Sequence, residues 1–252
     1  MHDLAQFSMA DMAACSSALR QMGKGAQSME EVSGRIVEYL YGELSGGKDR
    51  EKPFALVRLF KTHSYGELAE DLRSFAQRLL GREPASNTKC LTLLATAGIK
   101  PEWRSRALSV GHQAIPLASV EGVARIPMIA NLVQQFGLEV SQILHPEPGV
   151  VADLSKQSFN VFHVEEAVGN PNIPAQDEFI VAEGIRSCLG FGGTLPHGDL
   201  FAVIMFSRMP ISSNTASLFR SLSLSVRIAL LPFELRVFAA HPNAPALPGR
   251  EE

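Results

Sequence analysis

The sequence predicts an α+β protein with one central antiparallel sheet and flanking N- and C-terminal helices. Apolar runs of strand length alternate with stretches in which apolar residues recur at helical spacing. Near the C-terminus a turn rich in proline and glycine joins two apolar runs, as in a β-hairpin. Helical patterns stand at both ends of the chain. Antiparallel strands bracketed by helices are typical of the α+β class.

The amino-acid composition excludes several classes of protein. The 252 residues include 23 Lys and Arg and 26 Asp and Glu, a net charge of -3, so the basic excess of a nucleic-acid binder is absent. A hydrophobic share of 46% and a charged share of 19% exclude disorder for most of the chain. The three distant cysteines favour a reducing, cytoplasmic environment over a disulfide framework. No signal peptide or long apolar span is evident, so we expect no membrane span.

Residues 1–50 are expected to form two helices and a polar connection. Asp3 with Gln6 is a possible capping box for the first helix, and Ser28 with Glu31 for the second. The second helix carries one apolar stripe, at Val32, Ile36 and Leu40.

The next segment alternates predicted strands and helices. The dense apolar run Phe54–Phe60 suits a buried strand, and Cys90–Ala97 is a second strand. Between them, Ser64 is expected to cap a helix that Gly81 ends. The apolar face of that helix is Leu68, Leu72, Phe75 and Leu79.

A less regular segment follows. Residues 101–113 are interpreted as a loop or short helix. Pro127 suits the first turn of a helix that ends at Gly137. Leu138–Leu144 is interpreted as a short strand.

The C-terminal half has three predicted strands and a last helix. Phe159–Val164 alternates two faces, and Ile185–Phe191 and Leu200–Phe206 form the hairpin. Asn214 can cap the last helix, and Pro232 ends it. The proline-rich tail from residue 241 is expected to fray.

The segment 159–212, and above all Ile185–Ile211, resembles GAF-like sensory domains of bacterial signalling proteins. Cys90–Gly98 and Val110–Leu117 resemble upstream parts of the same group, so the resemblance covers Phe54–Leu231. Such domains often precede histidine kinase or diguanylate cyclase modules, as in two-component systems.

The resemblance implies a central antiparallel sheet with helices on one side and a ligand pocket on the other. It also implies that the first and last helices pair between subunits. We therefore expect N-terminal helices in 1–50, the sensory domain in 51–235 and a flexible tail in 236–252. Residues 99–157 form a longer insert than a small domain of this group carries.

The glycine-rich motif and the histidines suggest two further kinds of site, a phosphate loop and a metal site. Gly190–Gly193 could cradle a phosphate, but a second apolar strand follows instead of a helix, so hairpin or bulge geometry is favoured. No pair among His112, His145, His163 and Cys188 has the spacing of metal ligands, which disfavours haem or metal ligation. His163 and Cys188 could still meet across strands, so such a site stays open. The cofactor is therefore left unassigned.

Six side chains are expected to bind a ligand: Phe162, His163, Cys188 and His112 in the pocket, with Trp103 and Arg106 from a lid. Each has a structural alternative. His163 beside Glu165 and Glu166 can orient a ligand or share a proton, or be an edge-strand histidine beside solvated acids. Cys188 can be a thiol activated by Arg186 or an inert buried residue.

These observations favour a sensory or regulatory module. A small ligand, redox change or partner would alter the pocket and shift the terminal helices, which would signal to a partner protein. The stripe Leu218, Leu222 and Val226 favours a helical homodimer. A scaffolding dimer with a filled pocket is the alternative. An enzyme is disfavoured, because no nucleophile, base and orienting group are recognisable as a set.

Overall fold

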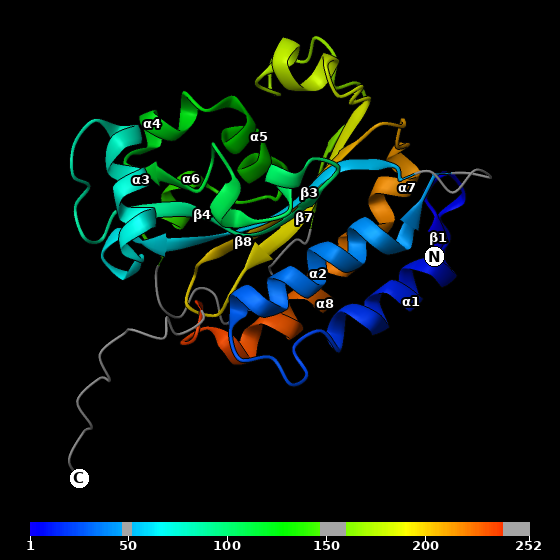
Figure 1. The fold of residues 1–252 in the computed structure, drawn as a ribbon, viewed down its shortest axis with the longest axis horizontal. Coiled ribbons are helices and arrows are strands. Elements are labelled where there is room, and N and C mark those ends of the chain that lie inside the picture. Colours follow the sequence, from blue (N-terminus) through cyan, green and yellow to red (C-terminus); the bar gives the residue numbers. More distant parts are fainter. Residues whose placement is uncertain (47–51, 147–159, 239–252) are drawn as a thin grey trace.

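The computed structural model describes residues 1–46, 52–146 and 160–238, and its centre is a six-stranded antiparallel sheet (Figure 1). The strand order is β5-β4-β3-β8-β7-β6. The strands are β3 (Phe54–Ser64), β4 (Lys89–Gly98), β5 (Ala114–Leu117), β6 (Val161–Val164), β7 (Ser187–Thr194) and β8 (Leu200–Ser207). All five pairings are antiparallel, which confirms the predicted α+β class.

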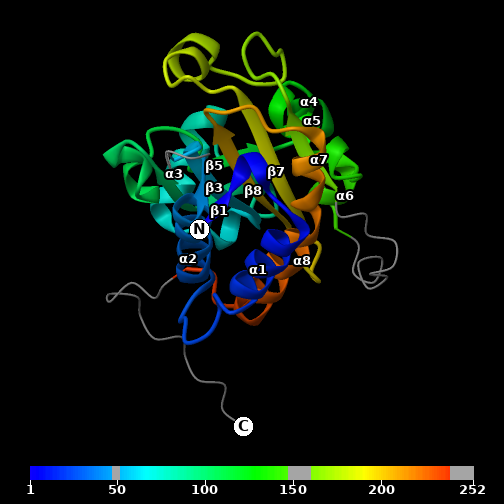
Figure 2. The same cartoon turned by 90° about the vertical axis from the view of Figure 1, so that its right-hand side faces the viewer.

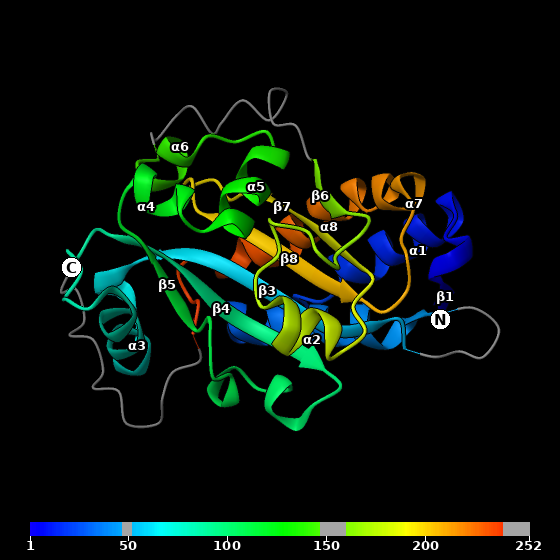
Figure 3. The ribbon, with the colours of Figure 1, turned by 90° about the horizontal axis from the view of Figure 1, so that it is seen from above.

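Helices cover both faces of this sheet. One layer consists of α1 (Met9–Arg20), α2 (Met29–Glu43), α7 (Ser213–Leu218) and α8 (Arg220–Leu230). The opposite layer consists of α4 (Val120–Ala124), α5 (Pro127–Gln135), α6 (Val140–Leu144) and the π-helical turn η6 (Gln176–Val181), as the views in Figures 2 and 3 show. Helix α3 (Glu70–Leu80) packs beside β5. A short parallel pair, β1 (His2–Asp3) with β2 (Leu44–Ser45), ties the N-terminus to the end of α2.

The central strand β3 serves two cores at once. Val57 and Leu59 pack into the core under α1, α2 and α8, whereas Leu56 and Phe60 pack into the core under α4, α5 and α6. Successive side chains of a strand point to opposite faces, so a strand covered on both faces must be apolar almost throughout. This is why Phe54–Phe60 has no polar alternation.

The C-terminal hairpin is formed as predicted. β7 and β8 pair over their full length, from Ser187 opposite Ser207 to Thr194 opposite Leu200. Gly192 lies within this pairing, and a side chain there would meet the backbone oxygen of Phe201 and the ring of Phe136. The glycines of this motif therefore serve close strand and helix packing, as expected for hairpin geometry.

Three boundaries differ from the sequence prediction. The first helix begins at Met9 under a capping box of Ser8 and Asp11, because Asp3 caps only the short 3-10 turn Leu4–Gln6. Ser64 remains in β3, and α3 begins at Glu70. The predicted short strand at Leu138–Leu144 is wrong, because Val140–Leu144 is helical.

Three details of the helix predictions also change. The Ser28 hydroxyl accepts from the Glu31 amide as expected, but the Glu31 carboxylate accepts from the Gln27 amide rather than the Ser28 amide. Leu79 is exposed and so is not part of the buried face of α3. The last helix starts under a Ser212 cap rather than at Asn214. Residues 147–159 and the tail 239–252 lie outside the described residues.

The terminal helices pack within the chain. Leu222 and Val226 of α8 are fully buried against the chain's own sheet, so they do not form the predicted dimer contact. The outer face of the same helix exposes Leu224 and Ile228. In the described residues one helical stretch, Ser213–Phe233, is long and apolar enough to cross a membrane, and 56% of it is buried inside the molecule, as in a core helix.

Asp199, in the turn of the hairpin, forms ion pairs with two lysines. Lys61 Nζ is 2.7 Å from Asp199 Oδ2, and Lys89 Nζ is 2.9 Å from Asp199 Oδ1. Burial alone would raise the pKa of Asp199, but the two ammonium groups outweigh it and hold that pKa below its usual range. The chain thus supplies a counter-ion for the buried Lys61.

Replacing Gly192 tests the packing of the hairpin. Gly192→Ala should lower the free energy of unfolding by about 1–3 kcal/mol, because the new methyl group overlaps the Phe201 carbonyl. Gly34→Ala is the matched control, since nothing lies within 4 Å of the added atom in the middle of α2. That control should raise stability by about 0.5–1 kcal/mol. Urea unfolding followed by circular dichroism measures both, and equal effects would contradict the packing described.

Candidate functional site

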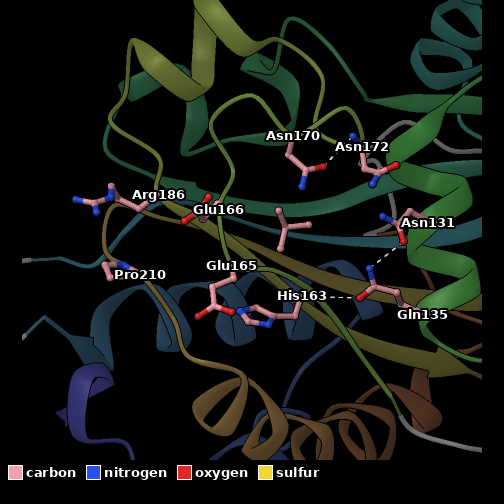
Figure 4. A pocket seen from close by; sticks show the side chains of 10 residues that line it. Asn131, Gln135, His163, Glu165, Glu166, Asn170, Asn172, Arg186 and Pro210 are labelled. Carbon is pink, nitrogen blue, oxygen red and sulfur yellow. Dashed lines mark hydrogen bonds between the residues drawn. The ribbon is translucent and has the colours of Figure 1, made fainter.

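A polar pocket of about 570 Å³ lies beside the edge strand β6 (Figure 4). It is formed by α5, by β6 and the segment after it, by the residue before β7 and by the segment after β8. Its lining residues are Asn131, Gln135, His163, Val164, Glu165, Glu166, Asn170, Asn172, Arg186 and Pro210.

The edge position of β6 creates the polar character of this wall. Among the strands of the described residues β6 pairs only with β7, so its outer backbone groups have no neighbouring strand there. The Gln135 side chain of α5 substitutes for one, because its Oε1 accepts from the His163 amide at 2.8 Å. Gln135 Nε2 in turn donates to Asn131 Oδ1 at 2.8 Å. The two carboxamides are thereby held in fixed orientations at the pocket wall.

The His163 ring links the pocket to the C-terminal helices. Its Nε2 lies 2.8 Å from the Ile211 carbonyl oxygen. A carbonyl only accepts hydrogen bonds, so Nε2 carries the proton. Ile211 is the residue before Ser212, whose hydroxyl caps α7. His163 therefore bonds at once to a pocket residue and to the segment that begins α7.

The opposite rim carries charge. Glu165 and Glu166 follow β6 and are exposed, and the exposed Arg186 lies on the same side of the pocket, across from Asn131 and Gln135 (Figure 4). The Asn170 side chain accepts from the Asn172 amide at 2.9 Å, which fixes the turn above them. Four carboxamides, two carboxylates, one imidazole and one guanidinium face one space. Such a set suits a small ligand with several hydrogen-bonding groups.

The six side chains predicted to bind a ligand do not share one pocket. Only His163 lines the pocket beside β6. Phe162 and Cys188 are completely buried on the other side of β6 and β7, in the core under α4, α5 and α6. Burial raises the pKa of the Cys188 thiol far above its usual range, so Arg186 does not activate it.

The predicted lid residues are held by the chain itself. The Trp103 ring packs edge-on against Phe179 at 5.5 Å, and Lys100 Nζ lies 4.8 Å from its centroid. Arg106 pairs with Glu30 at 2.9 Å and with Asp71 at 3.3 Å. Ligand binding by these two residues stays a prediction.

Arg106 also borders a second cavity, of about 250 Å³, between α2 and β4. His112 lies apart from both cavities, at the end of the loop before β5. Among the residues that the structure describes, no group of three or more His, Cys, Asp or Glu could hold a metal ion.

Sequence reasoning missed most of the pocket. Asn131 and Gln135 stand four apart on α5, which is the spacing of one helix face, and this was the available signal. It also missed Arg58, the single charged residue within Phe54–Phe60. A cation in the middle of a strand buried on both faces is a signal that the sequence alone carries.

Comparisons with known proteins show distant likenesses of fold only. No protein-family model and no curated protein matches the chain. A similar solved structure is the GAF domain of a phosphoenolpyruvate-protein phosphotransferase from Coxiella burnetii, 12% identical with a TM-score of 0.43, over 89% of this chain and 94% of that one. Another is the bacteriophytochrome RpBphP3 from R. palustris, 8% identical with a TM-score of 0.41, over 91% of this chain and 39% of that one.

The cysteines provide a test of the closed core. Cys15, Cys90 and Cys188 are all free and fully buried, so the native protein should react with a thiol reagent such as DTNB only after unfolding. Ser221→Cys, at an exposed position of α8, is the control and should add one rapidly reacting thiol. Rapid reaction of the unmutated native protein that Cys188→Ser abolishes would instead support a redox-sensitive thiol.

Proposed function

We propose that this chain is a sensory or regulatory module whose pocket beside β6 binds a small polar ligand. The observation that carries the proposal is the double contact of His163. Its amide bonds to Gln135 at the pocket wall, and its ring bonds to the Ile211 carbonyl before α7. A ligand that moves the wall therefore acts on the start of a terminal helix.

Terminal helices are suited to transmit such a change. Phe219, between α7 and α8, stacks on Phe7 at 4.9 Å and lies 6.1 Å from the ring of Phe191 in β7. Helix α8 packs on α1, so the N- and C-terminal ends of the fold meet there. Packed interfaces shift between discrete arrangements rather than deforming continuously. A shift at Ile211 would thus reach the surface formed by α1 and α8, where a partner protein would sense it.

The character of the pocket indicates the class of ligand. Two glutamates face one arginine, and none of the lining residues is Ser, Thr, Cys or Lys. The excess of acceptors favours a ligand that carries amino or other donor groups. The lack of a nucleophile favours binding over covalent catalysis.

A scaffold with a filled pocket is the second candidate. The sheet face under α4, α5 and α6, where the resemblance placed a ligand pocket, is occupied by buried apolar side chains such as Phe162 and Ile204. In this alternative the exposed Leu224 and Ile228 of α8 would form a homodimer contact. A dimer in light scattering that Leu224→Glu dissociates, with no ligand response, would favour it.

Ligand binding can be measured on the whole chain. A panel of amino acids, polyamines, nucleosides and sugars should contain a compound that raises the melting temperature, since binding to the native state stabilises it. Glu166→Gln and Asn131→Ala should weaken that response at least fivefold. Glu102→Gln, at an exposed position outside the pocket, is the control and should leave it unchanged. A panel without any response, or equal responses in all variants, contradicts the proposal.

Transmission can be separated from binding with His163→Phe. The phenyl ring keeps the shape but loses the bond to the Ile211 carbonyl, which should cost about 1 kcal/mol of stability. The variant should still bind the ligand. In hydrogen exchange, we expect the ligand to protect residues 211–230 of the unmutated protein. This protection should be absent in the variant. Unchanged protection in this variant would show that His163 does not couple the pocket to α7 and α8.

A further inference from the structure

Arg58 lies in the middle of the sheet, half-buried, with its Nε enclosed. It stands in β3 opposite Thr96 of β4 and Ile204 of β8. Leu56 and Phe60, two residues away on either side, pack into the core under α4, α5 and α6. By the alternation of the strand, Arg58 faces that side of the sheet too.

The Arg58 guanidinium has few hydrogen-bond or charge partners among the described residues. Within the described residues its only hydrogen bond is from Nη2 to Ser109 Oγ, at 3.2 Å. Its Nε is enclosed and has no hydrogen-bond partner there. Burial lowers its pKa to about 10, and no acidic group among the described residues offsets that shift. Buried charges in proteins are ordinarily paired, because removing a lone charge from water is costly.

Lys61, three residues further along β3, is paired with a carboxylate, as buried cations ordinarily are. Lys61 is buried, and Asp199 Oδ2 lies 2.7 Å from its Nζ. The same strand therefore holds one buried and one half-buried cation, and among the described residues only Lys61 has a carboxylate partner. An arginine presents five donors in a planar fork that matches a carboxylate or a phosphate.

The loop beside Arg58 is held in a fixed shape. Ser109 Oγ donates to the Gly111 carbonyl at 2.8 Å, and Gln113 Nε2 donates to the Ser109 carbonyl at 2.6 Å. These bonds present His112 in the left-handed region, with φ 64°, which costs a residue other than glycine about 1 kcal/mol or more. Backbone strain of this kind occurs preferentially at binding and catalytic sites.

His112 adds a second basic group. The residue is exposed to solvent, yet burial of its ring lowers its pKa, and the charge of Arg58 nearby lowers it further. No hydrogen bond ties the ring to any other part of the chain that the structure covers, so both of its nitrogens are available to a ligand.

We propose that Arg58, with Ser109 and His112, binds the carboxylate or phosphate group of a small ligand. Arg58 would donate from its Nη groups to the oxygens of that group, and His112 would close over it from the loop. This site is separate from the pocket beside β6 and does not depend on its occupant.

The experiment uses the whole chain and two simple probes, inorganic phosphate and acetate, each against sodium chloride at matched ionic strength. At least one probe should raise the melting temperature in a saturable manner, and the probe that does so identifies the preferred oxyanion. Arg58→Met should abolish this response. The variant should remain folded, with an unchanged or higher melting temperature without the anion, because it removes a half-buried charge that has no carboxylate partner among the described residues.

Further variants make the result specific. Arg58→Lys keeps the charge but loses the fork, so its anion affinity should fall at least tenfold. His112→Ala should weaken binding less. Arg82→Met, at an exposed arginine, and Glu166→Gln, in the pocket beside β6, should leave the response unchanged. The proposal is overturned if neither probe gives a saturable response, or if Arg58→Met responds like the unmutated protein.

Discussion

The fold depends on one strand, β3, whose two faces pack into two different hydrophobic cores. β3 pairs antiparallel with β4 on one edge and with β8 on the other, and helices cover both of its faces. The pairing with β8 joins residues about 150 positions apart in the chain, from Phe54 opposite Ser207 onward. The N-terminal helices, the insert and the C-terminal hairpin are thereby organised around a single apolar element. Any polar side chain on that element must find a partner within the protein or in a ligand.

The same constraint explains what the sequence revealed about the fold. Phe54–Phe60 and Leu200–Phe206 read as strands because burial on both faces leaves a continuous apolar run. Gly192 and Gly193 marked the hairpin, since the neighbouring strand and helix leave no room for a side chain at Gly192. The prediction failed at Leu138–Leu144, where five helical residues are too few to show a helical period.

The candidate site was less predictable for a geometric reason. Its residues come from four separate segments, and what unites them is the unpaired outer edge of β6. Edge position is a property of strand order, which local periodicity does not contain. The prediction that Phe162 and His163 line one pocket is wrong, because alternation along β6 puts His163 at the pocket and Phe162 in the core.

Polar groups in this sheet fall into two kinds, and the difference points to where ligands act. Lys61 and Ser187 are buried with partners from their own chain, Asp199 for the first and the Met209 carbonyl for the second, so they stabilise the fold without outside help. Among the described residues, Arg58 and the acids after β6 are not matched in this way. A half-buried cation without a carboxylate partner, beside a strained histidine, costs stability that an apolar residue at position 58 would restore. Retaining such a group is explained if its partner comes from outside the chain, and binding that partner would then stabilise the strand to which both cores are attached.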